Sequence, residues 1–82
     1  MITDKARPYY VAMVDDLLLF YLSVGKGLSD TQLFMEISNR FGDRLLVEVC
    51  PYLDLDIGEC TIGAIAVMKE AAGRAVHESK KS

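Results

Sequence analysis

The sequence has few of the residues on which most active sites and disulfide scaffolds depend. Among 82 residues it holds one histidine, His77, and two cysteines, Cys50 and Cys60. His77 lies near one end and has no evident arrangement of a carboxylate with a serine or cysteine around it, so a nucleophilic triad is not indicated. The neighbours of both cysteines are apolar or acidic, which does not favour a reactive thiolate. We therefore expect no enzyme activity and no cofactor.

Long apolar runs are also missing. A membrane-spanning helix needs about 18 to 20 uninterrupted apolar residues, and Asp15 and Asp16 divide the best candidate. The first ten residues, MITDKARPYY, lack the apolar core of a cleavable signal peptide. Two cysteines without such a signal are weak grounds for a disulfide framework. These absences predict a cytoplasmic protein with no membrane partner and two free thiols.

Metal and phosphate motifs are incomplete. The stretch DLDIG at 54–58 begins like a calcium loop, but its glycine comes one position early and Ile65 stands where the loop needs a glutamate. The segment GKGLS at 25–29 is too short for a phosphate loop. We expect neither a metal site nor a nucleotide site.

The chain has more apolar residues than a small core easily hides. Hydrophobic residues make up 51% of it, slightly above the roughly 45–50% usual for soluble domains. A chain of this size buries only about 60–65% of the surface that it exposes when unfolded. We expect residues 1–82 to form a single helical domain that associates with itself or with a partner. The net charge of −3 argues against binding to nucleic acid or to an anionic membrane.

The segment 8–24 carries the main indication of association. Read as a helix, it is apolar around most of its circumference, where a surface helix is usually apolar on one face. One stripe at helical spacing is expected to face the core; it comprises Tyr10, Met13, Val14, Leu17, Phe20, Tyr21 and Val24. A second stripe lies beside it and includes Val11, Leu18 and Leu22. We expect self-association through Val11, Leu18, Leu22 and Tyr21.

The predicted fold is all-α: a small bundle of three longer helices and one short one, forming a dimer. Residues 1–7 form a flexible arm and residues 79–82 a frayed tail. After the helix at 8–24, Ser29 and Gln32 have the spacing of a capping box, so a second helix begins at Asp30. Gly42 is expected to end it.

The second half of the chain is predicted to contain a short helix and a long one. Residues 43–50 suit a short helix with Leu45, Leu46, Val49 and Cys50 facing inward, although the run LLVEV is also compatible with a strand. Residues 52–57 alternate apolar and acidic, as in a turn. A last helix at 57–77 has an apolar stripe of Ile62, Ile65, Met68, Ala72 and Val76.

Residues 30–50 have about the lengths expected of a helix-turn-helix, with Ser38 and Gly42 at the small-residue and turn-glycine positions. Asp43 and Glu48 fall where the second helix would need apolar anchors, and Arg44 is its only cation. Nucleic acid is therefore not the expected partner. A dimeric DNA-binding regulator with a degenerate motif stays as an alternative, as does a structural assembly subunit.

Acidic residues gather in the middle of the chain. Between residues 43 and 60, five acids stand against one base; they are Asp43, Glu48, Asp54, Asp56 and Glu59. Such a surface suits a partner protein with a basic surface. The sequence thus predicts a small non-enzymatic protein–protein interaction module, a regulator or inhibitor on a homodimeric helical scaffold. The acids themselves are also compatible with a merely solvated face.

Overall fold

The protein is all-α, as predicted. A computed structural model describes the backbone of residues 7–81 and the side chains of residues 7–75. Within these residues lie four α-helices, α1 (Val11–Ser23), α2 (Asp30–Glu48), α3 (Cys50–Leu53) and α4 (Ile57–Lys81), and two 3-10 turns, η1 (Arg7–Tyr10) and η2 (Gly25–Gly27). Apart from Arg7, the predicted arm lies outside the described residues. Three longer helices and a short one are present, but the short helix is not where the sequence predicted it.

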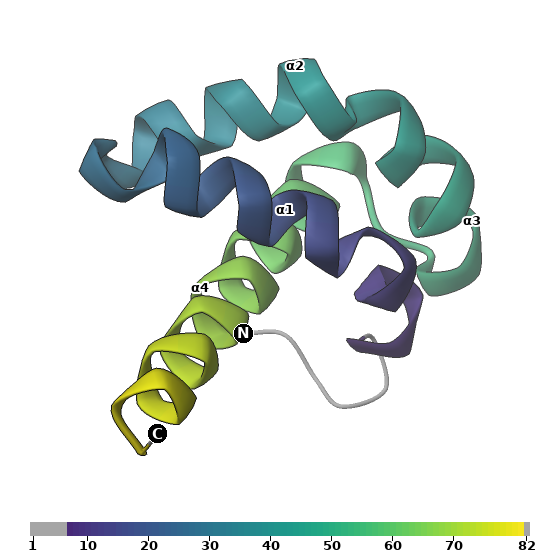
Figure 1. Ribbon diagram of the computed structural model, residues 1–82. Coiled ribbons are helices and arrows are strands. Elements are labelled where there is room, and N and C mark those ends of the chain that lie inside the picture. Colours follow the sequence, from purple (N-terminus) through teal and green to yellow (C-terminus); the bar gives the residue numbers. More distant parts are fainter. Residues whose placement is uncertain (1–6, 82) are drawn as a thin grey trace.

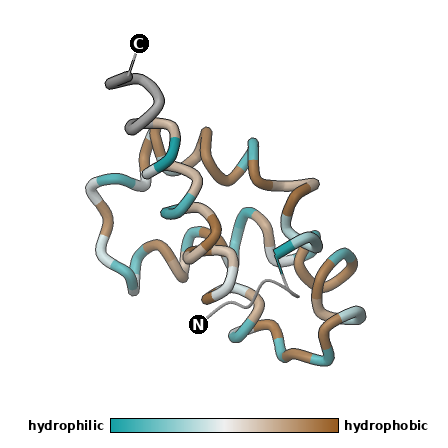
Figure 2. Tube along the Cα trace, turned by 90° about the horizontal axis from the view of Figure 1, so that it is seen from below, coloured by the Kyte–Doolittle hydropathy of each residue, from teal (hydrophilic) through white to brown (hydrophobic). Residues whose placement is uncertain are grey.

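The three longer helices share one core. In Figure 1, α1 and α2 lie side by side with η2 between them in the chain, and α4 runs across them before its C-terminal half extends away from the bundle. Both α1 and α2 pack on α4. Hydrophobic positions recur along each helix and alternate with hydrophilic ones (Figure 2). The core therefore lies where the three helices meet.

The predicted inner stripe of α1 is largely confirmed. Tyr10, Met13, Leu17 and Phe20 are buried, while Val14 and Tyr21 are half-buried against the same core. Val24 was expected in this stripe, but it lies beyond the end of α1 and is half-exposed. The helix period thus predicts the buried face until the helix ends.

The predicted capping box of α2 is confirmed. The Gln32 backbone N–H donates to the Ser29 side chain at 3.2 Å, and the Ser29 N–H donates to the Gln32 side chain at 3.0 Å. The accompanying apolar residues lie inward, with Leu33 buried and Leu28 half-buried. This local pattern alone fixes where α2 begins.

The turn before α2 passes close to side chains of the neighbouring helices. No described glycine has a positive φ, so Gly25 is not explained by a left-handed backbone. A Cβ on the buried Gly25 would lie 3.0 Å from Tyr21 Cδ1 and 3.1 Å from Leu33 Cδ2. Glycine suits this position, because a larger residue would push aside side chains of both α1 and α2 by a few tenths of an ångström.

The prediction that Gly42 ends the second helix is wrong. α2 continues through Gly42 to Glu48, because Phe41 and Leu45 on either side of it both lie in the core. No separate helix begins at Asp43, and Leu46 points outward instead of inward. The helix-turn-helix is excluded as well, because there is no turn at Gly42.

The chain reverses after α2 through a single helical turn, α3. Its last residue precedes Asp54, the only non-glycine residue with positive φ in the described chain (φ 53). The Asp56 carboxylate accepts a hydrogen bond at 2.8 Å from the Glu59 backbone N–H, which caps α4. The predicted start of the last helix is therefore confirmed, and α4 continues past His77 to Lys81.

The predicted inner stripe of α4 is shifted. Met68 and Ala72 are buried as expected, but Ile62 is mostly exposed and Ile65 only half-buried. The buried face is instead made mainly of smaller side chains, and its members are Cys60, Thr61, Ala64, Val67, Met68 and Ala72. Small residues let α4 approach α1 and α2 closely. Val76 of the predicted stripe lies outside the residues whose side chains are described.

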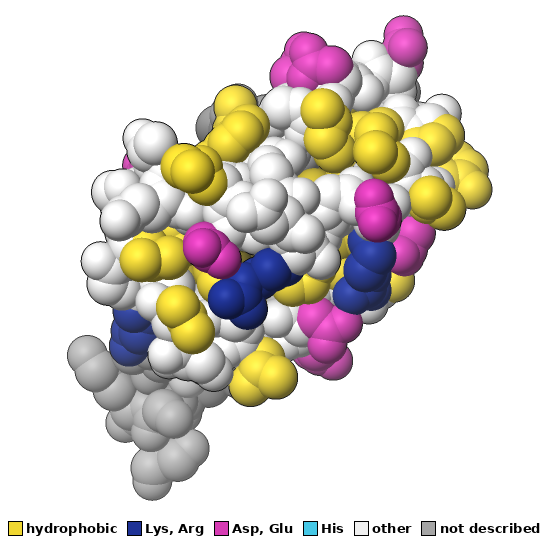
Figure 3. Space-filling model, turned by 90° about the horizontal axis from the view of Figure 1, so that it is seen from above, with side chains coloured by type: hydrophobic (Ala, Val, Ile, Leu, Met, Phe, Trp, Pro, Cys, Tyr) yellow, Lys and Arg dark blue, Asp and Glu magenta, His cyan; other side chains and the backbone are white. Residues whose placement is uncertain are grey.

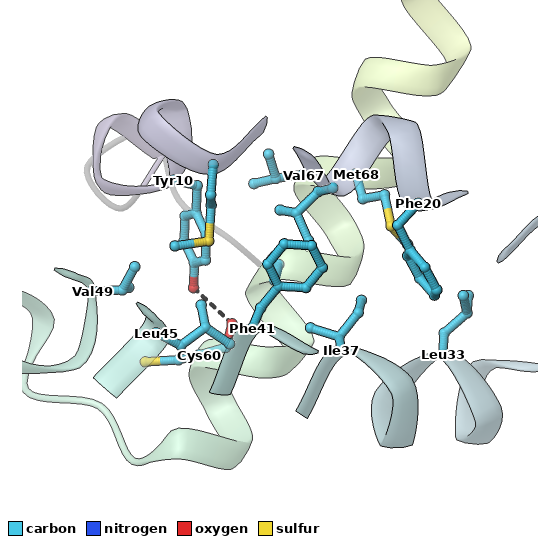
Figure 4. Packing of buried hydrophobic residues seen from close by; sticks show 13 residues of the cluster. Tyr10, Phe20, Leu33, Ile37, Phe41, Leu45, Val49, Cys60, Val67 and Met68 are labelled. Carbon is cyan, nitrogen blue, oxygen red and sulfur yellow. Dashed lines mark hydrogen bonds between the residues drawn. The ribbon is translucent and has the colours of Figure 1, made fainter. Parts of the chain in front are cut away.

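Figure 4 shows the core around a buried tyrosine. The Tyr10 hydroxyl donates to the Cys60 carbonyl oxygen at 2.9 Å and so joins η1 to the first turn of α4. Burial, followed by the nearby Cys60 and Cys50, raises the pKa of Tyr10 well above its ordinary value. Phe20 and Phe41 meet edge to face, with ring centroids 6.4 Å apart.

Candidate interaction surface

The outer side of α1 exposes a row of apolar residues, here called the α1 outer face: Val11, Leu18, Leu19 and Leu22. Val11 is 65% exposed, Leu19 is 67% exposed and Leu22 is 45% exposed. At 3.6 residues per turn, residues 11, 18 and 22 lie within about 40° of one another around the helix. The opposite side of the helix is buried in the core, and among the described residues Val11, Leu19 and Leu22 stay open to solvent.

Two predicted members of this surface lie deeper than the others. Leu18 is half-buried, and the Tyr21 side chain packs against the core. Tyr21 is therefore at most at the edge of a self-association surface. Leu19 lies one turn before Leu22 and enlarges the exposed apolar row.

A cavity of about 300 Å³ adjoins this face between the start of α1 and α4. Val11, Val14, Val67 and Ala71 contribute apolar walls. Its polar lining consists of Asp15 and a linked set of charges in which Arg7 contacts Glu70 at 3.1 Å and Arg74 also contacts Glu70. An apolar centre with a polar rim is the usual anatomy of a protein–protein interface.

The predicted acids do not form one uniform surface. Asp43 and Glu48 lie on α2, whereas Asp54, Asp56 and Glu59 lie on the α3–α4 connection and the first turn of α4. Glu48 is half-buried and accepts a hydrogen bond from Arg44 at 3.2 Å. Asp56 is occupied as the cap of α4. Asp54 and Glu59 are exposed and make the α3–α4 connection the more accessible acidic part.

Arg44 ties α2 to α1 and reduces the acidity of that region. Its Nη1 donates to Asp16 at 2.7 Å, and its Nη2 donates to the Ala12 carbonyl oxygen at 3.2 Å. Hydrogen bonds with Asp16 and Glu48 raise the pKa of Arg44. The one base of the acidic segment is thus a bridge between helices and not a free recognition residue.

Two surface features were missed at the sequence level. The Tyr9 and Tyr52 rings stack with centroids 5.6 Å apart and planes 9° apart, although both side chains are exposed. An open groove of about 460 Å³ between α2 and α4 has mostly apolar walls, formed by Phe34, Met35, Ile62, Ile65 and Ala66, with Asp30 and Thr31 at its edge. The sequence does not predict this groove, because the helical pattern places Ile62 and Ile65 in the core.

The face seen from above in Figure 3, to which α2 belongs, has a different character. Hydrophobic side chains are scattered over it among acidic and basic ones. Arg40 lies over the Phe20 ring at 4.9 Å and contacts Glu36 at 3.0 Å. Arg40 and Glu36 cover part of the core here, although Met35, Leu46 and Val47 of the same helix are also exposed.

Other kinds of site find little support in the described residues. They contain no group of three or more His, Cys, Asp or Glu side chains placed to hold a metal ion. None of the described helices has the length and apolar character to cross a bilayer. Comparison with protein-family models, with curated proteins and with solved structures finds no significant match.

Proposed function

We propose that the protein is a non-enzymatic protein–protein interaction module of the cytoplasm that acts as a regulator or inhibitor. It associates as a homodimer through the α1 outer face and binds a basic partner with the acidic α3–α4 connection. The observation that carries the proposal is the exposure of Val11, Leu19 and Leu22 on a helix whose other side is the core.

Burial of this row offers a clear gain in free energy. Each large aliphatic side chain removed from water contributes about 1.5 to 3 kcal/mol when it becomes fully buried. Asp15 lies on the same side of α1, so two copies must be offset to keep its carboxylates apart. Arg74 lines the same cavity as Asp15. Its positive charge reduces the repulsion between the two Asp15 carboxylates in an offset dimer.

Binding of a basic partner requires carboxylates that are exposed and available for contact. Asp54 and Glu59 are exposed, and among the described residues neither carboxylate takes part in an ion pair between helices. Tyr52 is also exposed and lies two residues before Asp54. An aromatic ring beside carboxylates can contact the stems of Lys and Arg side chains while the acids attract their charges.

The first prediction concerns self-association. The wild-type chain is expected to show about twice its 9.1 kDa mass by light scattering. Leu22→Glu is expected to weaken the dimer about 30-fold or more, because it introduces an unpaired charge into the apolar contact. Leu22 is preferred to Leu18, whose half-buried side chain also contributes to the monomer's own fold.

Leu46→Glu is the matched control for this substitution. Leu46 is a leucine of similar exposure on α2 and lies away from the α1 outer face. Its replacement should leave the mass unchanged. A wild-type chain that stays monomeric at every concentration, or equal dissociation by both variants, would contradict the proposed dimer.

The second prediction concerns the acidic connection. A fluorescent lysine-rich peptide is expected to bind the wild-type chain more weakly as salt increases. The double variant Asp54→Asn, Glu59→Gln should bind it roughly tenfold more weakly, since each lost contact with an exposed charge is worth up to about 1 kcal/mol. Asn tolerates the left-handed backbone at position 54, so the connection should keep its shape.

The control for this test changes the same number of charges elsewhere. Asp30→Asn with Glu36→Gln removes two exposed or half-exposed carboxylates of α2. If this variant weakens peptide binding as much as the first, only the net charge matters and the proposed acidic surface is wrong.

A further inference from the structure

The fold brings the two cysteines of the chain into direct contact. Cys50 is the first residue of α3 and Cys60 lies in the first turns of α4, yet their Sγ atoms are 2.8 Å apart. Both thiols are free. The nine residues between them fold back on themselves through α3 and the left-handed Asp54, so this contact is a product of tertiary structure.

The two thiols differ in their access to solvent. Cys60 is fully buried, whereas Cys50 is half-buried. Burial and the adjacent Cys50 raise the pKa of the Cys60 thiol to about 12. A reagent from solution can therefore reach Cys50, while Cys60 is protected behind it.

The surroundings permit a covalent bond between the two sulfur atoms. A disulfide has its sulfur atoms about 2.05 Å apart, so the pair has to close by less than 1 Å. Cys50 belongs to a helix of a single turn, which is held by few hydrogen bonds and can shift more readily than α4. Cys60 is fixed from the other side, because its carbonyl oxygen accepts the Tyr10 hydroxyl.

We propose that Cys50 and Cys60 form a reversible oxidation site, at which a low-molecular-weight disulfide such as oxidised glutathione converts the two thiols into an intramolecular disulfide. Cys50 is the attacking residue and Cys60 the resolving residue. The disulfide links α3 covalently to α4 and restricts the movement of the segment between them, which carries Asp54, Asp56 and Glu59. This inference does not depend on the proposed dimer or on a basic partner.

The reaction proceeds by two thiol–disulfide exchanges. The Cys50 sulfur loses its proton and attacks one sulfur of oxidised glutathione, so that the glutathione S–S bond breaks and one glutathione leaves as a thiolate that takes up a proton. The Cys60 sulfur then loses its proton and attacks Cys50 Sγ, which releases the second glutathione in the same way. The two protein thiols are oxidised, and one glutathione disulfide is reduced to two glutathione thiols.

The test treats the reduced full-length chain with a series of oxidised and reduced glutathione ratios. The reaction is stopped with acid, free thiols are alkylated, and the intact mass is measured. We expect a species that is lighter than the reduced chain by two hydrogen atoms and takes up no alkyl groups. Reduction with dithiothreitol should restore both alkylation sites. The oxidised chain should also unfold at a temperature higher by at least about 5 °C, because the disulfide restrains the unfolded chain.

Single variants assign the two roles. Cys60→Ser should accumulate a mixed disulfide of Cys50 with glutathione, because no second thiol can resolve it. Cys50→Ser should stay unmodified while it is folded, because Cys60 is buried. Circular dichroism checks that each variant is helical, and Cys60→Ala replaces Cys60→Ser if a buried hydroxyl unfolds the chain.

Several outcomes would overturn the proposal. One is a wild-type chain whose thiols are both alkylated at every glutathione ratio, which would make them packing residues only. Another is a stable mixed disulfide on the wild-type chain, or a disulfide between two chains in place of one within the chain. Faster modification of Cys50→Ser than of Cys60→Ser would reverse the assigned roles and contradict the argument from burial.

Discussion

Replacing Leu17 by alanine is expected to lower the free energy of unfolding by about 3 kcal/mol. The Leu17 side chain is completely buried, on a helix that packs against α4. Truncation removes its contacts and leaves a cavity that the surrounding helices fill only in part. In a chain of 82 residues such a loss is a large fraction of the total stability.

Leu46→Ala provides the matched control. It is the same substitution at a leucine of α2 that is 52% exposed and lies outside the α1 outer face. We expect it to change the free energy of unfolding by less than about 0.5 kcal/mol. Urea denaturation followed by circular dichroism, at several protein concentrations, measures both. Similar losses in the two variants would mean that the buried face of α1 is wrongly assigned.

The second large effect is a loss of stability in alkaline solution. Burial raises the pKa of Cys60 from 9.0 to about 12 and raises that of Tyr10 well above 10.0. Both groups are neutral when protonated, so above pH 9 the unfolded chain loses protons that the folded chain retains. The free energy of unfolding should therefore fall as pH rises from about 9, by at most about 1.4 kcal/mol per pH unit for each group.

Tyr10→Phe separates the contribution of the tyrosine. The variant lacks the hydrogen bond to Cys60 and should be less stable near pH 8, by about 1 kcal/mol. It also lacks the titrating hydroxyl, so its stability should fall less steeply with pH. The curves of wild type and variant are expected to converge above about pH 10. Parallel curves from about pH 8 to about pH 11 would show that Tyr10 does not titrate differently in the two states.

Local signals in the sequence were sufficient where a few neighbouring residues decide the structure. The Ser29–Gln32 cap depends on two side chains and two backbone N–H groups of one turn, and its spacing alone predicts it. The buried side of α1 follows from the helix period, since Leu17 and its neighbours in the stripe recur at that period. These parts of the fold require no knowledge of distant contacts.

The neighbours of Gly42 in the sequence do not show that the helix continues through it. A glycine inside a helix costs about 1 kcal/mol relative to alanine, which makes it a reasonable end to the helix. Phe41 and Leu45 are buried against the other helices, however, and their packing outweighs that cost. A Cβ at position 42 would meet open space, so no close approach explains the glycine. The competing energies come from residues that are distant in the sequence.

The face of α4 was misread for a related reason. Hydrophobicity alone favours Ile62 and Ile65 as core residues, whereas the smaller Ala64 is fully buried and Ile62 is mostly exposed. The choice between neighbouring stripes depends on how closely two other helices can approach. The α2–α4 groove and the Cys50–Cys60 contact depend on the same tertiary arrangement, which explains why neither was predicted. The exposure of Val11 and Leu22 on α1, in contrast, follows from a helix that has more apolar residues than one core can cover.

The length of α4 has a practical consequence for how the molecule moves in solution. A helix of 25 residues is about 37 Å long at 1.5 Å per residue, and the principal extents of the molecule are 40 × 25 × 19 Å. Since the end of α4 projects beyond α1 and α2 (Figure 1), the molecule is elongated and tumbles more slowly than a sphere of equal mass. A single chain would therefore elute early from a gel-filtration column calibrated with spherical standards.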